Sequence, residues 1–291
     1  MLHMYKAWYN PIRGGIQMTY IIIILSAILL TMISISIYKA NQNTKDIQIN
    51  KIQIATKQQT NRSNLSILHL SDLHLENISI TPSQLASKLQ DEKPDIIALT
   101  GDFLDRKRSI PKLVPYLEVL QTMKPTHGIY AVLGNHDYVL KEGNLLKLKS
   151  ILTEYGCTVL ENTSETIEIN GQKINIIGID DYSTNRSNLK KSYEQVEDGL
   201  NIVLTHDPNV VLEMDNYPFD YLLAGHFHGG QILYPKAYHL VKMGKLPRLN
   251  MVKGLHTHND SPFYISEGLG QTGVNIRVGS RPEITIHDVA I

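Results

Sequence analysis

Asp-Ile-Ile-Ala-Leu-Thr-Gly-Asp-Phe-Leu-Asp-Arg (residues 95–106) and Ile-Tyr-Ala-Val-Leu-Gly-Asn-His-Asp (residues 129–137) follow the same pattern. In each stretch an apolar run of strand length ends at a glycine, and polar side chains follow at once. Open α/β sheets bind their ligands at the carboxyl ends of their strands. The two stretches therefore predict an α/β fold with a polar site at the ends of its strands.

Polar residues follow three further apolar runs in the same way: Asp72-Leu73-His74, Thr205-His206-Asp207 and Gly225-His226-Phe227-His228. Taken singly, each has an ordinary explanation, such as an aspartate that caps a turn, a surface histidine or a polar turn. Together the five motifs supply carboxylate, imidazole and amide groups in the numbers that two divalent cations need. The shared position of the histidines at strand ends favours metal ligation over a polar rim.

The residues between the motifs alternate between helix and strand patterns. Thr81-Pro82 predicts the first turn of a helix, and residues 111–123 and 142–155 have amphipathic patterns. Asn170-Gly171, between two alternating runs, predicts a hairpin with a type I′ turn. Helices interleaved with strands first, and hairpins later, predict two packed mixed β-sheets flanked by helices, a four-layer αββα sandwich.

Composition limits the classes of function. The formal net charge is zero and 19% of the residues are charged, below the ~25% of ordinary globular chains, so we expect no nucleic-acid partner. The single cysteine, Cys157, excludes an intrachain disulfide and a thiolate zinc cluster. Metal ligands must then come from histidine, aspartate, asparagine or glutamate, and the chain has twelve histidines.

Residues 20–38 form an apolar segment without a charged side chain. As a helix it would be about 28 Å long, close to the ~30 Å hydrocarbon core of a bilayer. We expect a single transmembrane helix before the folded domain. A cleaved signal peptide is the alternative, but this run exceeds the ~7–15 apolar residues of a signal peptide, and Tyr38-Lys39-Ala40 is a poor cleavage site. Basic residues flank both ends, so charge leaves the orientation open.

Four regions are expected along the chain. Residues 1–19 are an N-terminal flank, in which Met18 is a second possible start, and residues 20–38 are the anchor. Residues 39–63 are rich in Asn, Gln, Lys and Thr and predict a stalk. Residues 64–291 show no break in composition and predict one domain.

The five motifs, in this order, resemble the calcineurin-like metallophosphoesterase superfamily over roughly residues 65 to 291. The anchor and three further segments are similar to the membrane-anchored bacterial branch of that superfamily: His228-Gly229-Gly230-Gln231, Glu267-Gly268-Leu269-Gly270 and Arg281-Pro282-Glu283. This branch implies a catalytic domain on the extracytoplasmic side of a bacterial cell membrane, with a single-pass anchor.

The resemblance also implies roles for the residues of the motifs. One metal would be bound by Asp72, His74 and His228, and the other by Asn135, His206 and His226. Asp102 would bridge the two ions. His136 would be the acid near the leaving group, oriented by Asp105, and Arg106 would contact phosphate. The cofactors would be two divalent metal ions, such as manganese, iron or zinc, with their identity open.

The charge of such a site indicates its chemistry. Two dications contribute about +4, and Asp72, Asp102 and a bridging hydroxide remove about three charges, which leaves roughly one positive charge for a phosphoryl group. The metal-bridging hydroxide would attack phosphorus in line, and His136 would protonate the leaving oxygen, typically a ~10²–10⁴-fold contribution. The expected activity is hydrolysis of a phosphodiester or pyrophosphate bond at the membrane.

Alternative functions stay open. The substrate would be a phosphate ester, lipid-linked or associated with the cell wall, and one specific alternative is a UDP-diacylglucosamine-like pyrophosphatase. A catalytically silent, membrane-tethered metal-binding module is another, although it would not need His136 and Asp105. The His-x-His-x-Asp-His run of metallo-β-lactamases is absent. Residues 232–255 are either an apolar flap that covers the site or dips toward the membrane, or an ordinary packed insertion. The oligomeric state is open.

Overall fold

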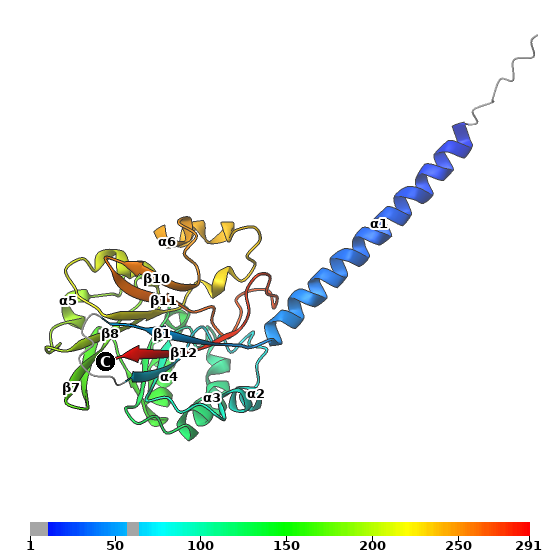
Figure 1. Cartoon of the computed structure of the whole chain (residues 1–291). Helices are drawn as coiled ribbons and strands as arrows, with labels where there is room; N and C mark the ends of the chain where they lie inside the picture. Colours follow the sequence, from blue (N-terminus) through cyan, green and yellow to red (C-terminus); the bar gives the residue numbers. More distant parts are fainter. Residues whose placement is uncertain (1–10, 57–63) are drawn as a thin grey trace, which may run out of the picture.

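The structure, a computed structural model, describes residues 11–56 and 64–291, with side chains from residue 17 onward. Two six-stranded sheets form the domain (Figure 1). The first has the order β1 (Gln48–Ile54), β12 (Glu283–Ala290), β2 (Asn64–Leu70), β3 (Ile96–Thr100), β4 (Ile129–Val132), β5 (Cys157–Val159). The second has the order β10 (Gly254–His258), β11 (Ser261–Ile265), β9 (Tyr221–Ala224), β8 (Leu200–Thr205), β7 (Gln172–Ile179), β6 (Thr163–Ile169).

Both sheets are mixed. In the first, strands β2 to β5 run parallel, β12 is antiparallel to β2, and β1 runs parallel to β12. In the second, β7, β8, β9 and β11 run parallel, with β6 and β10 antiparallel at the edges. The motif-bearing strands are all among the parallel ones, so their carboxyl ends meet at one end of the two sheets.

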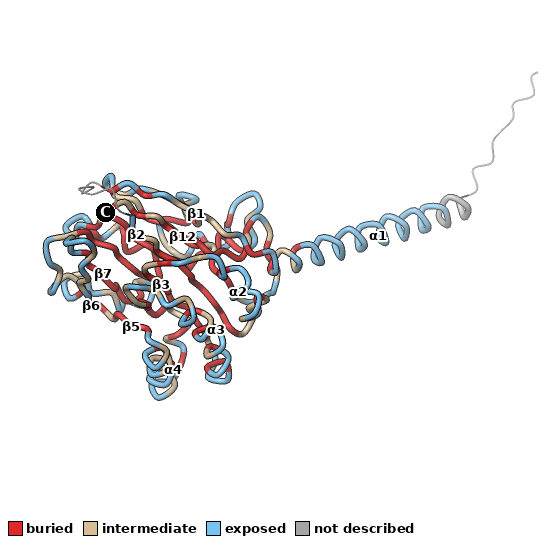
Figure 2. Tube along the Cα trace, turned by 60° about the horizontal axis from the view of Figure 1, so that its bottom comes forward, coloured by how far each residue is buried: buried red, intermediate tan, exposed pale blue. Residues whose placement is uncertain are grey.

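The two sheets pack face to face around an apolar core, seen as the red strands in Figure 2. Ile67, Ala98 and Val132 of the first sheet meet Ile202 and Leu223 of the second in this core. The predicted architecture of two mixed sheets flanked by helices is confirmed. The outer face of the first sheet is covered by α2 (Pro82–Leu89), α3 (Ile110–Thr122) and α4 (Glu142–Glu154).

The outer layer over the second sheet consists of short helical turns. They are η4 (Pro208–Glu213), η6 (Tyr238–Met243), α5 (Leu189–Ser192) and α6 (Lys245–Arg248). Pro208, Pro235 and Pro247 lie in the segments that cover this sheet, and proline removes a backbone donor and restricts helices. The remaining turns are η1 (Asn43–Lys45), η2 (Lys107–Ser109), η3 (Asp137–Val139) and η5 (His228–Gly230).

Several predicted boundaries are confirmed by their capping and turn chemistry. Thr81 caps α2 in a capping box with Gln84, and Pro82 occupies the first turn. Gly156, just after α4, has a φ of 81°. Asn170 and Gly171, between β6 and β7, have φ values of 53° and 82°, as a type I′ turn requires.

The stalk prediction is wrong for residues 48–54. They form β1, an edge strand whose seven residues pair with β12, and Ile54 is buried. The scattered isoleucines of this stretch are therefore the inward side chains of a strand, which its polar residues obscured. Residues 57–63 of the predicted stalk lie outside the described residues.

Helix α1 (Pro11–Gln42) leads into η1 and β1, and Figure 1 shows it projecting away from the domain. The span Gln17–Lys45, which runs from α1 into η1, contains an apolar window with a mean hydropathy of 2.6, none of which is buried. By length and composition this helix could cross a membrane, although a signal sequence passes the same test. The first ten residues of the predicted N-terminal flank lie outside the described residues.

Candidate metal centre

The five motifs converge where the parallel strands of both sheets end. The backbone N–H of Asp72, after β2, donates to the carbonyl of Gly101, after β3, at 3.0 Å. The N–H of Gly225, after β9, donates to the carbonyl of His206, after β8, at 3.1 Å. His206 Nδ1 lies 2.7 Å from the Thr100 carbonyl and so joins the two sheets. Strand pairing thus sets the spacing of the polar side chains.

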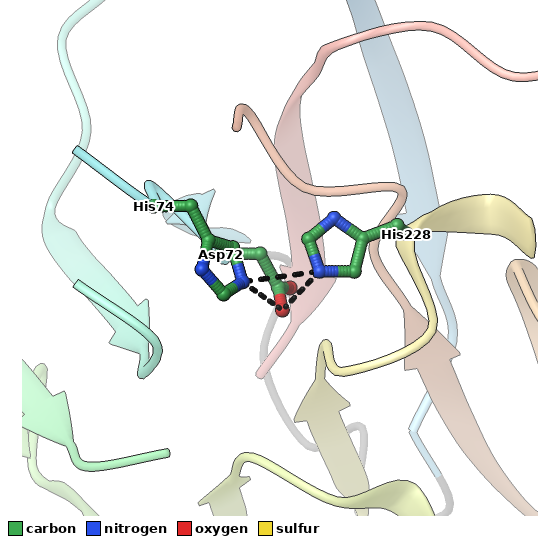
Figure 3. A group of neighbouring side chains, drawn as sticks. All are labelled: Asp72, His74 and His228. Atoms are coloured by element: carbon green, nitrogen blue, oxygen red, sulfur yellow. Dashed lines mark hydrogen bonds and ion pairs between the residues drawn. The ribbon is translucent and has the colours of Figure 1, made fainter. Parts of the chain in front are cut away.

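Asp72, His74 and His228 form the first group that could hold a metal ion (Figure 3). The Nε2 atoms of the two histidines lie 3.1 Å apart, and His228 Nε2 lies 3.4 Å from Asp72 Oδ1. All three side chains are buried and point toward one another. This is the set expected to hold one of the two ions.

Asp102, His206 and His226 form the second group. His206 Nε2 lies 3.1 Å from Asp102 Oδ2 and 3.0 Å from His226 Nδ1. All three residues are buried. Two of them, His206 and His226, belong to the set expected for the second ion.

Asp102 lies between the two groups. Its Oδ2 is 3.1 Å from His206 Nε2 and 3.3 Å from His74 Nε2, so one carboxylate oxygen faces an imidazole of each group. Its Oδ1 accepts the backbone N–H of His136 at 2.8 Å. Burial raises the pKa of Asp102, but His206 and His74 outweigh burial and hold it well below its usual range. The side chain is therefore an anion placed to face two sites.

Asn135 provides the clearest test of whether these residues fit a metal. Its Oδ1 is buried and has no hydrogen-bond partner among the described residues, although the residue lines the same cavity as Asp102. A buried amide oxygen without a partner costs about 1–3 kcal/mol. A divalent cation accepts such an oxygen as a ligand, so the donor set fits the expected ions.

Hydrogen bonds of the histidines orient their free nitrogens. Nδ1 of His206 faces the Thr100 carbonyl at 2.7 Å, and Nδ1 of His228 faces the Gly270 carbonyl at 3.2 Å. Because a carbonyl only accepts, each Nδ1 carries a proton, which leaves Nε2 as the nitrogen that could bind a metal ion. The backbone thereby selects the tautomer that a metal ligand needs.

The backbone at the candidate ligands is unusual. Asp72 and His74, just after β2, have φ values of 50° and 40°, in the left-handed region and not in the extended region of a strand. Positive φ values also occur at three further candidates, Asp102, His226 and His228. Residues other than glycine rarely adopt this backbone region, and such strained conformations are common at functional sites. The Asp72 and His74 side chains still converge, but through left-handed turns.

The predicted catalytic residues are only partly brought together. The ring of His136 lies edge-on to His74 with centroids 4.8 Å apart, and the side chain lines the cavity. Its Nδ1 lies 3.8 Å from Asp105 Oδ2, an ion-pair distance but too long for a hydrogen bond. Arg106 is exposed, its backbone N–H donates to Glu76, and it is not among the described residues that line the cavity.

The cavity above both groups has a volume of about 420 Å³. Its walls are largely apolar and come from residues 231–243 and from a loop at residues 272–274. His239, which belongs to none of the five motifs, also lines the cavity. His256 and His258 are not among the described residues that line this cavity. His256 hydrogen-bonds to the Lys253 carbonyl, and His258 hydrogen-bonds to Asp215.

Three supporting residues escaped sequence reasoning. The carboxylate of Asp137 accepts the backbone N–H groups of Asp102, Phe103, Leu104 and Gly134, and thus joins two motifs. Glu76 accepts the N–H groups of Asp105 and Arg106. The guanidinium of Arg277, fully buried, donates to the carbonyls of Glu267, Gly268, Gly270 and Arg281. An arginine inside the run Val274–Val278 was the only sequence signal for it.

Comparison with known proteins shows which family the chain belongs to. The sequence model of a family described as calcineurin-like phosphoesterase matches residues 65–230. The chain belongs to the calcineurin-like phosphoesterase family. The resemblance stated from the five motifs is thereby confirmed, and it extends to homologues named metallophosphoesterases.

Relatives of this phosphoesterase cover most of its length. A Bacillus subtilis (strain 168) protein, "Uncharacterized metallophosphoesterase YkoQ", is 63% identical over 254 residues, 87% of this chain and 94% of that protein. "UDP-2,3-diacylglucosamine pyrophosphatase LpxG" of Chlamydia trachomatis is 27% identical and covers 76% of this chain and 82% of that protein. The solved structure of phosphopantetheinyl hydrolase (PptH) from Mycobacterium tuberculosis aligns over 72% of this chain and 91% of that chain, with 11% identity and a TM-score of 0.44. Family membership supports phosphoester hydrolysis with divalent metals.

Proposed function

We propose that this phosphoesterase binds two divalent ions and hydrolyses a phosphodiester or pyrophosphate bond at a membrane. The observation that carries the proposal is the position of Asp102, whose Oδ2 faces His74 at 3.3 Å and His206 at 3.1 Å. Asp72, His74 and His228 would bind one ion, and Asn135, His206 and His226 the other. When bound, the ions would supply positive charge for the phosphoryl oxygens and acidify the attacking water.

In this proposal His136 protonates the leaving oxygen. It lines the cavity and is about one-third exposed, whereas the candidate ligands other than Asn135 are almost fully buried. Asp105 Oδ2 lies 3.8 Å from His136 Nδ1 and would orient the ring as the substrate enters. A positioned acid of this kind contributes about 10²–10⁴-fold to the rate. We propose that the exposed Arg106 contacts a phosphate of the substrate outside the cavity.

The substrate class we propose is a lipid-linked or wall-associated phosphate ester. Support comes from the apolar cavity walls, from the apolar helix α1 and from the similarity to a protein named as a pyrophosphatase of a lipid-linked UDP-sugar. We propose that α1 is a single-pass anchor, with the domain outside the cytoplasm. Protease accessibility of the domain in sealed cells would test that orientation.

A substrate screen tests the proposed function. The metal-loaded full chain would be assayed on a soluble phosphomonoester, a soluble phosphodiester and a UDP-sugar lipid in mixed micelles. We expect turnover of the phosphodiester or the lipid pyrophosphate. No turnover of any of them, with metal bound, would favour the silent metal-binding module instead.

A further inference from the structure

The exposed apolar side chains of the domain are concentrated in one stretch of the sequence. Outside α1, nine large apolar side chains are exposed among the described residues, and all but Val139 and Leu146 belong to residues 232–255 or to Val274. The seven are Ile232, Tyr234, Tyr238, Val241, Leu249, Leu255 and Val274. We call these seven the apolar rim. A concentrated exposed apolar patch marks a protein or membrane contact.

Residues 232–255 are also strongly basic. They contain Lys236, Lys242, Lys245, Arg248 and Lys253 and no aspartate or glutamate, in a chain whose net charge is zero. Among the described residues, Lys253 is the only one of these five that forms an ion pair with a carboxylate, with Glu267 at 2.9 Å. The other four basic side chains are exposed. Aromatic and aliphatic side chains mixed with unpaired cations are typical of surfaces that bind anionic bilayers.

This segment is half packed and half exposed. Ala237, Leu240, Leu246 and Val252 are buried against the second sheet. Residues 232–255 are therefore anchored in the core. Poor packing of the segment does not explain its exposed side chains. Tyr234 and Tyr238, which are 82% and 63% exposed, project from a fixed base.

The rim is attached to the end of α1 by hydrogen bonds. The backbone N–H of Arg277 donates to the Ala40 carbonyl at 2.8 Å, and the Asn41 and Asn43 side chains donate to the carbonyls of Asn275 and Arg277, both at 2.8 Å. The loop that carries Asn275 and Arg277 is also the loop that carries Val274. The apolar helix thus ends on the loop that forms part of the rim.

A second set of hydrogen bonds joins that loop to the start of the segment at residues 231–233. Gln231 Nε2 donates to the carbonyls of Thr272 and Val274, both at 3.0 Å. Leu233 donates its N–H to the carbonyl of Val278 at 2.7 Å. In Figure 1 the segment around α6, coloured yellow to orange, lies at the top of the domain, and α1 projects from the right-hand side of the domain toward the upper right.

We propose that residues 232–255 and Val274 form a second membrane contact, which binds the surface of an anionic phospholipid bilayer beside the anchor. The proposal rests on α1 being the membrane anchor proposed above. The tyrosines and aliphatic side chains enter the headgroup region, and the four unpaired cations meet lipid phosphates. Ile232 and Val274 line the metal cavity as well as the rim. The cavity then opens at headgroup level, and its substrate is a phosphate ester carried in the bilayer.

The test uses the full chain reconstituted in nanodiscs. Tyr238→Cys carries an environment-sensitive fluorophore, which is selective because Cys157 is buried. The matched control is Leu146→Cys, 59% exposed on α4. In discs of phosphatidylcholine with phosphatidylglycerol, lipids with a quencher at a shallow acyl position should quench the label at 238 at least threefold more than the label at 146. Equal quenching at the two positions overturns the proposal and leaves a protein partner as the explanation of the rim.

Two further measurements test the role of the basic side chains and the proposed catalytic activity separately. Replacing Lys236, Lys242, Lys245 and Arg248 with glutamine, or adding ~1 M salt, should reduce the quenching at 238 at least twofold, because salt screens such contacts. Quenching unchanged in both arms contradicts the role of the cations, and the salt arm needs no variant to fold. Turnover of the soluble phosphodiester and of the UDP-sugar lipid is measured on the same samples. Absence of turnover of both substrates, with quenching retained, overturns the proposed activity alone.

Discussion

The proposed bridging role of Asp102 depends on one oxygen atom, Oδ2. Asp102→Asn keeps the shape of the side chain but replaces a charged oxygen that faces His74 and His206. We expect turnover to fall to background and metal content to fall below that of the wild type. The reason is that the variant has no negative charge between the two groups of candidate ligands. Turnover near the wild-type rate, measured with metal in excess, would exclude the bridge.

His136 is predicted to act on the substrate and not to hold metal. His136→Ala should retain the metal content and lose about 10²–10⁴-fold in kcat. Asp105→Asn is the companion variant and should lose less, because it only orients the ring. His136, His74 and Asp102 also form a group that could hold a metal ion. Loss of metal from the alanine variant would therefore assign His136 to the ligands.

Gly225 is predicted to be required because the site leaves no room for a side chain there. A Cβ at this position would collide with Ser71 Oγ and Asp72 Oδ2. Gly225→Ala should reduce metal occupancy and lower the free energy of unfolding by about 1–3 kcal/mol. Gly143→Ala is the control, since a Cβ there meets nothing within 4 Å on α4. The two variants behaving alike would contradict the close packing.

At the scale of elements, two buried histidines lie where β2 and β12 face the second sheet. His69 Nε2 lies 2.8 Å from Thr100 Oγ1, and His287 Nδ1 lies 2.8 Å from the hydroxyl of Tyr221. Burial lowers the pKa of His69 to about 3, and burial together with His69 lowers the pKa of His287 well below its usual value. Both rings are therefore neutral in the folded protein at neutral pH.

This burial predicts a loss of stability in acid. Below the unfolded pKa of ~6.5 the unfolded chain binds a proton at His287 and the folded chain does not, so unfolding becomes easier by up to about 1.4 kcal/mol per pH unit. His287→Gln should flatten the decline of Tm between pH 6.5 and 4.5, compared with the wild type in the same buffers. Parallel Tm curves would show that His287 is not buried as a neutral ring.

Local patterns predicted most elements because their signals are short-range. Capping at Thr81 and the Asn170-Gly171 turn act over a few residues, and each is seen as predicted. Strand β1 was missed because its partner, β12, begins at Glu283, more than 200 residues away in the sequence. The left-handed turns at Asp72 and His74 were missed because the surrounding loops impose them.

At the scale of the whole molecule, the sequence indicated which side chains come together at the candidate metal centre, but not which residues support them. The ligands have distinctive side chains at strand ends, so their types and order are informative. Glu76 accepts a backbone N–H from a residue 29 positions away in the sequence, and Arg277 donates to backbone carbonyls of an irregular loop. No local sequence pattern records either contact. The same holds for α1, whose end is attached to the loop at Asn275 and Arg277.

The central claim is that this phosphoesterase works with two divalent ions between its two sheets. The most direct test is elemental analysis of the purified full chain, with turnover of a soluble phosphodiester followed through chelation and metal return. We predict about two divalent ions per chain, loss of turnover on exhaustive chelation, and recovery when one metal species is added back. Full turnover after the metal has been removed would contradict the account.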